Sequence, residues 1–176
     1  MEKNGITILT GCTVDGIEKH DDWYTSHLSN GSSIASDKVM FAIGRHPAVA
    51  NLGLEKAGVA INPDNGGIVV NEASQSSVPH IYAVGDVTHR FNLTPVAIRE
   101  GHAFADTVFG KRAVKVDHID IPPAVFTQPQ VGTVGLTEAQ ARAQFAIVDV
   151  YKAAFRPLKA TLSGSESRVL MKLVVD

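Results

Sequence analysis

The sequence has almost no cysteine. Among its 176 residues, Cys12 is the single thiol. This excludes an intrachain disulfide, a CxxC redox motif and a zinc site built on several thiolates. A reaction that uses two thiols therefore needs cysteines that lie outside this chain. Cys12 belongs to no recognisable redox motif, and we interpret it as a buried or incidental thiol.

The sequence also lacks an excess of charge and a long apolar run. Its 16 Lys and Arg residues nearly balance its 18 Asp and Glu residues, for a net charge of -2. This balance argues against binding to nucleic acid or to an anionic membrane. No apolar stretch approaches the roughly 20 residues of a membrane-spanning helix, and the N-terminus shows no apolar signal segment. The sequence predicts a globular protein of the cytoplasm with no membrane partner.

Histidine is present but in no metal-binding pattern. Neither HxxxH nor HExxH spacing occurs. We therefore predict no metal site. The seven histidines are His20, His27, His46, His80, His89, His102 and His118.

The first part of the chain predicts strands and turns. Residues 6–19 and 23–28 alternate apolar and polar side chains, which favours strands of a small antiparallel meander. Asn30 and Gly31 then form a strong hairpin signal before the next predicted strand, residues 32–44.

The end of that last segment is expected to be buried. Residues 40–43 read MFAI, a continuous apolar run that suits a strand covered on both faces. Gly44 ends the run, and Arg45 begins a loop.

The next segment predicts one short helix and two strands. Residues 52–58 indicate a helical turn that Gly58 ends. A tight turn is expected at residues 64–67. Residues 67–71 and 80–84 are apolar enough to be strands.

A longer helix is predicted to follow a polar loop. It begins near Thr94, with Thr94 as the N-cap and Pro95 at the first helical position, and Gly110 closes it. Its buried stripe is expected to consist of Val96, Ala97, Ala103, Phe104, Ala105 and Val108.

From residue 118 the pattern changes to that of an α+β unit. Two short strands are predicted around a proline-rich turn at residues 121–137. A short amphipathic helix at 137–145 and strands at 148–155 and 168–176 follow. The final strand is rich in Leu, Val and Met, and we expect it to lack a partner that covers it.

Gly85 and Asp86 stand where a predicted strand ends before a helix. A carboxylate at this place can accept hydrogen bonds from ligand hydroxyls, and the helix N-terminus favours negative charge. Asp86 can equally cap its own loop, since aspartate is common in turns. The residues alone leave both interpretations open.

The sequence contains the motifs FAIGRHP, IYAVGDV, LTPVA and PAVFTQPQVGTVGLTE, in this order. Together they resemble the flavoprotein pyridine nucleotide-disulfide oxidoreductases. Within that family, LTPVAIREG and the later FRPLKATLSG before MKLVV look most like glutathione reductases of the bacterial and plant type. The resemblance covers nearly the whole chain, and its specificity comes from the joint order of the motifs.

The resemblance implies roles for residues near an FAD. Asp86, after Gly85, is expected to bind the ribityl chain, while the Thr94 backbone N–H, between Leu93 and Pro95, faces the pyrimidine edge of the flavin.

The resemblance also implies roles near an NADPH. Gly44 and Arg45 match a pair near the cofactors, where Arg45 can reach a phosphate; a solvated loop cation is the alternative. Asn92 and Ala124 match positions whose backbone carbonyls lie by the nicotinamide.

The family's first FAD-binding GxGxxG, its nucleotide-binding GxGxxG, its redox-active cysteine pair and its C-terminal His-Pro motif are absent from the sequence. The chain therefore resembles an internal piece of a longer enzyme, with no catalytic residue of its own. The predicted fold is α/β and α+β. Residues 1–47 end an NADPH-binding domain, residues 48–117 form the returning segment of an FAD-binding domain, and residues 118–176 begin a dimerisation domain.

The leading functional hypothesis is part of an FAD-dependent NADPH:disulfide oxidoreductase, with glutathione disulfide as substrate and a homodimeric parent enzyme. A dihydrolipoamide dehydrogenase or mercuric reductase is an alternative, although LTPVA after Gly-Asp argues against the dihydrolipoamide enzymes, which resemble GP-x-LAH there. A non-catalytic flavin-binding or dimerisation module is another, because the cysteine pair is missing. His102 stands where mammalian-type glutathione reductases carry a substrate-binding arginine, so the disulfide substrate stays open.

Overall fold

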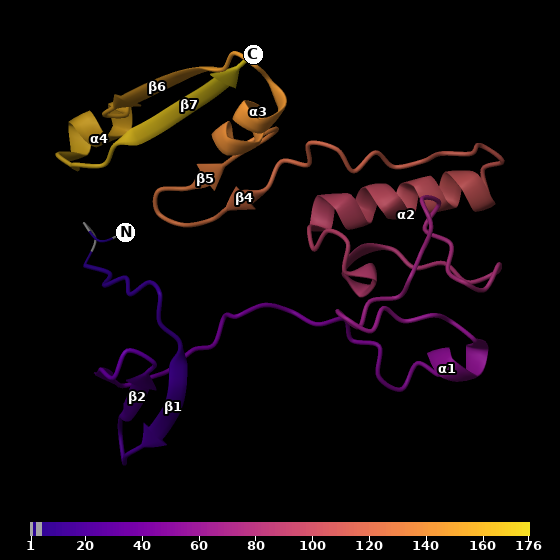
Figure 1. Ribbon diagram of the computed structural model, residues 1–176, viewed down its shortest axis with the longest axis horizontal. Helices are drawn as coiled ribbons and strands as arrows, with labels where there is room; N and C mark the ends of the chain where they lie inside the picture. The colour runs from indigo at the N-terminus through magenta and orange to yellow at the C-terminus, as the bar shows by residue number, and fades with distance from the viewer. Residues whose placement is uncertain (1, 3–4) are drawn as a thin grey trace. The chain divides into compact units, whose positions relative to one another are not determined.

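The computed structural model describes Glu2 and residues 5–176, which form two compact units (Figure 1). The first unit ends at Arg45 and the second runs from His46 to Asp176. None of the helices in the described residues has the length and apolar character needed to cross a membrane. The domain boundaries given above stay a prediction.

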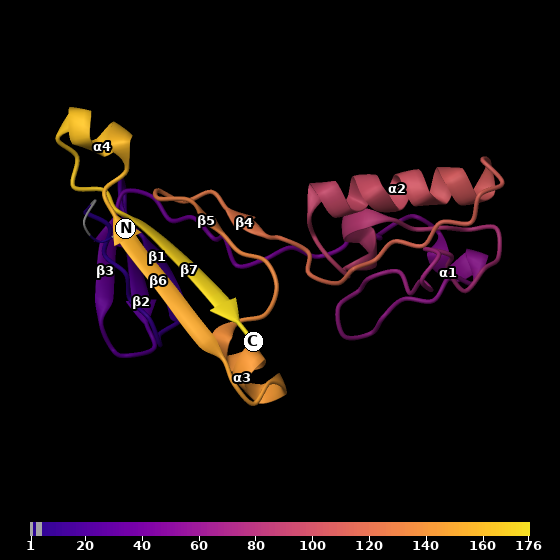
Figure 2. The same cartoon turned by 90° about the horizontal axis from the view of Figure 1, so that it is seen from above.

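The first unit contains a three-stranded antiparallel sheet in the order β1-β2-β3. Its strands are β1 (Val14–Lys19), β2 (Tyr24–Leu28) and β3 (Ser33–Ser36), visible together in Figure 2. The predicted hairpin turn is confirmed, because Gly31 has a φ of 83° and its N–H donates to the Leu28 carbonyl at 2.9 Å. A residue with a Cβ is disfavoured at this φ.

The prediction of a buried strand at residues 40–43 is wrong. These residues form no strand, and Met40 and Ile43 are 85% and 90% exposed. An apolar strand becomes buried only when other strands pair with its edges and other elements cover its faces. The three short strands of the first unit do neither for this run. The predicted strand at 6–19 is likewise shorter, since only Val14–Lys19 pairs.

The second unit begins with a small core beneath short turns. Helix α1 (Leu54–Ala57) ends at Gly58, which has a φ of 76°, so the predicted helical turn is confirmed. The core is built around three buried residues, Val59, Ile68 and Ala83.

The predicted strands at 67–71 and 80–84 are wrong. The backbone here forms only the isolated bridges Ile61–Ile68, Val70–Ser76 and Gln75–Tyr82. Each bridge joins a different pair of segments, so the pairing partner changes before a ladder can develop. The apolar residues are buried as the pattern suggested, but turns interrupt the pairing.

Helix α2 (Thr94–Val108) follows the 3-10 helix η2 (Gly85–Thr88), and the two pack together in the second unit (Figure 1). The predicted helix is confirmed, but its N-cap is Leu93 and not Thr94. Leu93 has extended backbone angles (φ -130°, ψ 126°), and its carbonyl accepts from the N–H groups of Val96 and Ala97. The backbone geometry sets the N-cap position. The preference of threonine for N-cap positions does not move the cap to Thr94.

The buried stripe of α2 differs from the predicted one. Val96 and Ala103 are buried as expected, whereas Ala105 and Val108 are exposed. Glu100, which carries a carboxylate, is the buried residue between Val96 and Ala103 in the sequence.

The last part of the chain follows the predicted α+β pattern. Antiparallel β4 (Ala124–Val125) and β5 (Val131–Gly132) flank the proline-rich turn. Helix α3 (Glu138–Gln144) begins with a capping box, in which Thr137 and Gln140 exchange hydrogen bonds. Strands β6 (Asp149–Phe155) and β7 (Val169–Val175) pair antiparallel.

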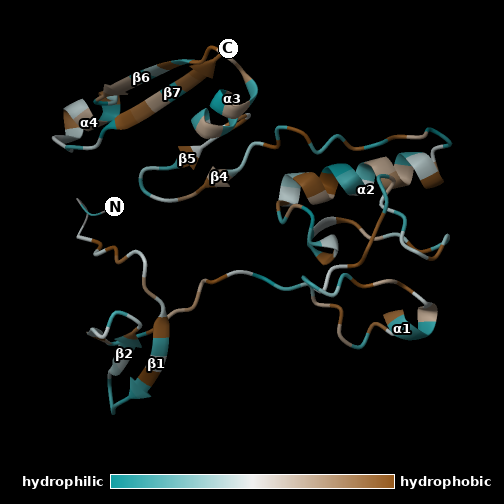
Figure 3. Cartoon of the chain, in the orientation of Figure 1, coloured by the Kyte–Doolittle hydropathy of each residue, from teal (hydrophilic) through white to brown (hydrophobic). Residues whose placement is uncertain are grey.

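An element absent from the prediction, α4 (Leu158–Ser163), lies between these two strands. The expected exposure of the final strand is confirmed, with Leu173 61% exposed. Figure 3 shows the hydrophobic colouring along β7. One face of this two-stranded sheet carries Tyr151, Phe155, Met171 and Leu173.

Glu138 joins α3 to β7 and gives the first prediction. The Lys172 ammonium, at 2.7 Å, and the Arg142 guanidinium, at 3.0 Å, lower the pKa of Glu138 from 4.5 to about 2. A lowered pKa stabilises the folded state above pH 4.5, and that contribution is lost as the pH falls toward 2. We expect the melting temperature of Glu138→Gln to lie below that of wild type at neutral pH and the difference to shrink across this window.

Thermal melts at a series of pH values measure this difference. Glu166→Gln is the matched control, because Glu166 makes no ion pair in the described residues. A difference that stays constant down to pH 2 would contradict the role of Glu138.

Candidate functional site

The carboxylate of Glu100 is the polar centre of the second unit. The residue is 2% exposed. Its Oε2 accepts a hydrogen bond from the Gly85 backbone N–H at 2.7 Å. Its Oε1 accepts from Arg90 Nη2 and from His118 Nε2, each at 2.8 Å. A buried carboxylate requires such donors, because burial without them costs several kcal/mol.

These bonds fasten three parts of the chain to α2. Gly85 begins η2, Arg90 lies in the loop that leads to the helix, and His118 lies in the segment after it. Arg90 also donates to Ser74 Oγ at 3.0 Å, which ties the loop to the core region. The Glu100 network therefore fixes the positions of η2, of the loop before α2 and of the segment after it.

Gly85 allows η2 to approach α2 closely. Its φ is 72°, and a Cβ built on it would lie 2.8 Å from the Ala97 Cβ. Both facts disfavour any other residue here. Asp86, the next residue, is exposed on η2, and its carbonyl accepts from the His89 N–H at 3.0 Å. The predicted Gly-Asp pair thus stands on a turn that is held against the helix.

A cavity of about 610 Å³ opens at the start of α2. Five predicted cofactor residues line it together, namely Asn92, Leu93, Thr94, Pro95 and Ala124. The opposite wall comes from residues 116–126, including Asp117, Ile119 and Phe126. No side chain caps the first turn of α2, so this end of the helix offers its partial positive charge to the cavity. Asp86 is not among the lining residues.

Gly44 and Arg45 lie in the first unit. Gly44 has a φ of 132°, a conformation that favours glycine, within an exposed stretch outside the sheet. Arg45 is exposed at the end of the unit. The placement of both residues near the cofactors and the phosphate contact of Arg45 stay predictions, as do the roles of the other predicted site residues.

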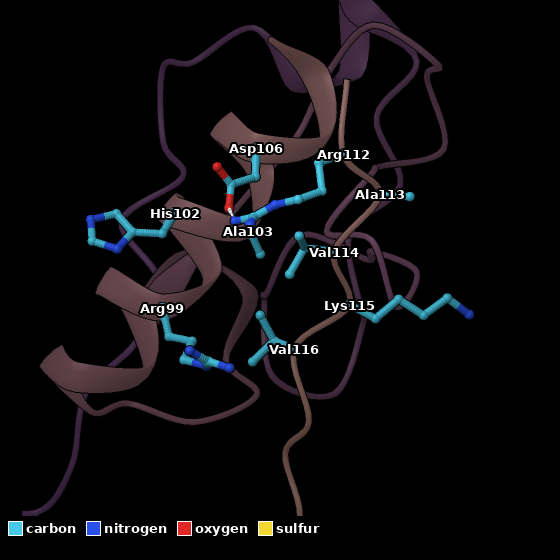
Figure 4. Close-up of a pocket in the computed structure, with 9 residues that line it drawn as sticks. All are labelled: Arg99, His102, Ala103, Asp106, Arg112, Ala113, Val114, Lys115 and Val116. Atoms are coloured by element: carbon cyan, nitrogen blue, oxygen red, sulfur yellow. Dashed lines mark hydrogen bonds and ion pairs between the residues drawn. The ribbon is translucent and has the colours of Figure 1, made fainter. Parts of the chain in front are cut away.

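A second cavity, of about 480 Å³, lies farther along α2, and Arg99 and Val116 line both cavities (Figure 4). Arg99, His102 and Asp106 line it from the helix, and Arg112 forms an ion pair with Asp106 across one end. His102 is exposed there. In the described residues, no group of three His, Cys, Asp or Glu side chains could hold a metal ion.

Sequence reasoning missed the Glu100 network. The available signal was the spacing of Val96, Glu100 and Ala103, which stand at i, i+4 and i+7 and therefore share one helix face. A carboxylate inside an apolar stripe implies buried donors. The identity of those donors, Arg90 and His118, depends on the tertiary fold.

The cavity suits one end of a flavin. Its lining is mostly apolar, as an aromatic ring system requires, and an uncapped helix start meets a ring edge that carries negative charge when reduced. Asp86, on the adjacent turn, carries the kind of carboxylate that accepts hydrogen bonds from ribityl hydroxyls.

Comparisons with known proteins show the family of this chain. Residues 1–101 match the model of the pyridine nucleotide-disulphide oxidoreductases, and residues 121–176 match the dimerisation domain of the same family. The chain is 49% identical over 176 residues to a glutathione reductase of Burkholderia cepacia. The aligned region spans 100% of this chain and 39% of that protein. It is 49% identical over 173 residues to the chloroplastic/mitochondrial glutathione reductase of Pisum sativum, covering 98% of this chain and 31% of that protein.

A solved structure shows the same fold. The HOCl-induced flavoprotein disulfide reductase RclA from Escherichia coli superposes with a TM-score of 0.89 at 29% identity, over 99% of this chain and 40% of that one. The fold is therefore that of part of a flavoprotein disulfide reductase. The chain belongs to the pyridine nucleotide-disulphide oxidoreductase family, whose members depend on FAD and NAD(P)H.

The Glu100 network gives the second prediction. Glu100→Ala removes the acceptor of one buried and two partly buried donors and should lower the free energy of unfolding by about 3 kcal/mol or more. Glu100→Gln should cost less, about 1–3 kcal/mol, because its amide oxygen can still accept from one donor.

Urea unfolding followed by circular dichroism measures both losses. Glu72→Ala is the control, since it removes an exposed ion pair with Lys115 and should cost about 1 kcal/mol or less. Equal losses for Glu100→Ala and Glu72→Ala would show that the network does not hold the unit together.

Proposed function

We propose that this chain is part of an NADPH-dependent, FAD-containing glutathione-disulfide reductase. The observation that carries the proposal is the cavity at the start of α2, which gathers Asn92, Leu93, Thr94, Pro95 and Ala124 beside the Gly-Asp turn. The identity to two glutathione reductases supports the choice of substrate.

FAD is the cofactor proposed for this cavity. The Asp86 carboxylate would accept hydrogen bonds from the ribityl hydroxyls, and the Thr94 N–H would lie by the pyrimidine edge. When bound, FAD accepts a hydride from a reduced nicotinamide and passes an electron pair to a disulfide. The residues of this chain would bind FAD and orient its ring. The Glu100 network would hold the Gly85–Asp86 turn and α2 in their relative positions.

NADPH is the proposed reductant. The backbone carbonyls of Asn92 and Ala124 would lie by the nicotinamide, and both residues line the same cavity. Gly44 and Arg45 would lie near the cofactors, where the Arg45 guanidinium would bind a phosphate.

The substrate and the partner follow from the same proposal. The disulfide is glutathione disulfide, and its reduction requires a cysteine pair that this chain does not carry. The match of residues 121–176 to a dimerisation domain supports a homodimeric parent enzyme. The parent enzyme is proposed to act in the cytoplasm.

NADPH oxidation with glutathione disulfide tests the proposal and is the third prediction. The full-length enzyme should turn over, because it supplies the cysteine pair. The 176-residue chain alone should not exceed a heat-inactivated control. A full-length enzyme that reduces another disulfide and not this one would refute the proposed substrate, whereas turnover by the chain alone would refute the need for an external cysteine pair.

The fourth prediction ranks three substitutions in the full-length enzyme. Asp86→Ala removes a charged acceptor worth roughly 1.5–3 kcal/mol, which weakens FAD binding roughly ten- to a hundredfold. Asp86→Asn should lose less, because its amide oxygen still accepts. Thr94→Ala should lose least, because the expected contact is made by the backbone and Leu93 provides the helix cap.

FAD retained after gel filtration and FAD titration into apoprotein measure this order. Should Thr94→Ala lose more FAD than Asp86→Ala, the carboxylate is not the ribityl anchor, and Asp86 serves only to cap its turn.

A further inference from the structure

His118 stands between two residues of the cavity wall, and its ring contacts Glu100 and Phe91. Asp117 and Ile119 line the cavity at the start of α2, whereas His118 does not. The His118 side chain is turned toward Glu100, to which its Nε2 donates at 2.8 Å. Its ring stacks on Phe91, with ring centroids 5.4 Å apart and planes 6° from parallel. His118 therefore anchors this wall of the cavity to α2 and to the loop before the helix.

The same carboxylate holds the Gly-Asp turn. Glu100 Oε2 accepts from the Gly85 N–H at 2.7 Å, and its Oε1 accepts from His118. Arg90 shares Oε1 and compensates the buried negative charge. One side chain thus joins the turn that carries Asp86 to the wall that carries Asp117 and Ile119.

We propose that His118 is a positioning residue, which acts through Glu100 to hold the Gly85–Asp86 turn and the 116–126 wall in the arrangement that binds FAD. The inference rests on the proposed function, because it concerns the affinity of that cavity for flavin. It adds a residue that lines no part of the flavin cavity and lies 32 positions beyond Asp86 in the sequence.

The stacking contact extends this effect to the first turn of α2. Phe91 directly precedes Asn92 and Leu93, which line the cavity. Loss of the His118 ring removes a packing surface for Phe91 as well as a donor for Glu100. We therefore expect the segment before α2 and the 116–126 wall to become less well ordered together.

Substitutions in the full-length enzyme that contains this chain test the proposal. His118→Ala should weaken FAD binding roughly tenfold, within the usual range of coupling between two sites. His118→Leu keeps an apolar side chain against Phe91 but removes the donor, so it should also weaken binding. His118→Gln places an amide N–H where the imidazole Nε2 stood and should restore most of the affinity.

Lys115→Met is the matched control in the same segment. Lys115 forms an exposed ion pair with Glu72 at 2.7 Å and does not line the flavin cavity. FAD titration into apoprotein gives the affinity, and the absorption spectrum of bound flavin reports the environment of its ring. Thermal melts of the FAD-free proteins measure stability separately. Lys115→Met should match wild type in affinity and spectrum.

The outcomes separate this inference from the proposed function. If wild type and His118→Ala bind FAD equally well, the positioning role is overturned while the proposed function stands. If His118→Gln loses as much affinity as His118→Leu, a hydrogen bond to Glu100 is not the cause, and the inference is again overturned. A full-length wild-type enzyme that binds no FAD would overturn the proposed function and this inference with it. Should His118→Ala not fold, the pair His118→Leu and His118→Gln decides.

Discussion

The second unit depends on one buried negative charge. Glu100 lies inside the apolar stripe of α2, where an unpaired carboxylate would be strongly unfavourable. It is tolerated because a backbone N–H, a guanidinium and an imidazole converge on its two oxygens. Those three donors come from separate parts of the chain, so satisfying one carboxylate also specifies how the turn, the loop and the following segment meet.

The elements that sequence reasoning predicted correctly are those governed by local signals. Gly31 and Gly58 mark turns through their backbone conformation, and Thr137 begins α3 by a capping box within four residues. The α2 helix was predicted for the same reason, although its cap was placed one residue too late. Such signals need no knowledge of distant parts of the chain.

The errors arose where the outcome depends on neighbours. Residues 40–43 are apolar enough for a buried strand, yet no strand of the first unit pairs with them. Residues 67–71 contribute Ile68 to the core, but Ile68 and Val70 pair with different segments, so no continuous ladder of strand hydrogen bonds forms. For the site, motif resemblance identified the residues that gather at the cavity, whereas the Glu100 network required the fold, because Arg90 and His118 lie on opposite sides of Glu100 in sequence.

The hydrogen bond from His118 to Glu100 constrains the length of the segment that follows α2. Inserting or deleting one residue between α2 and His118 would move the imidazole relative to the Glu100 carboxylate and break this hydrogen bond. Side chains on the cavity wall can change identity without that penalty. The number of residues between α2 and His118 is therefore constrained more tightly than the residue types on the cavity wall.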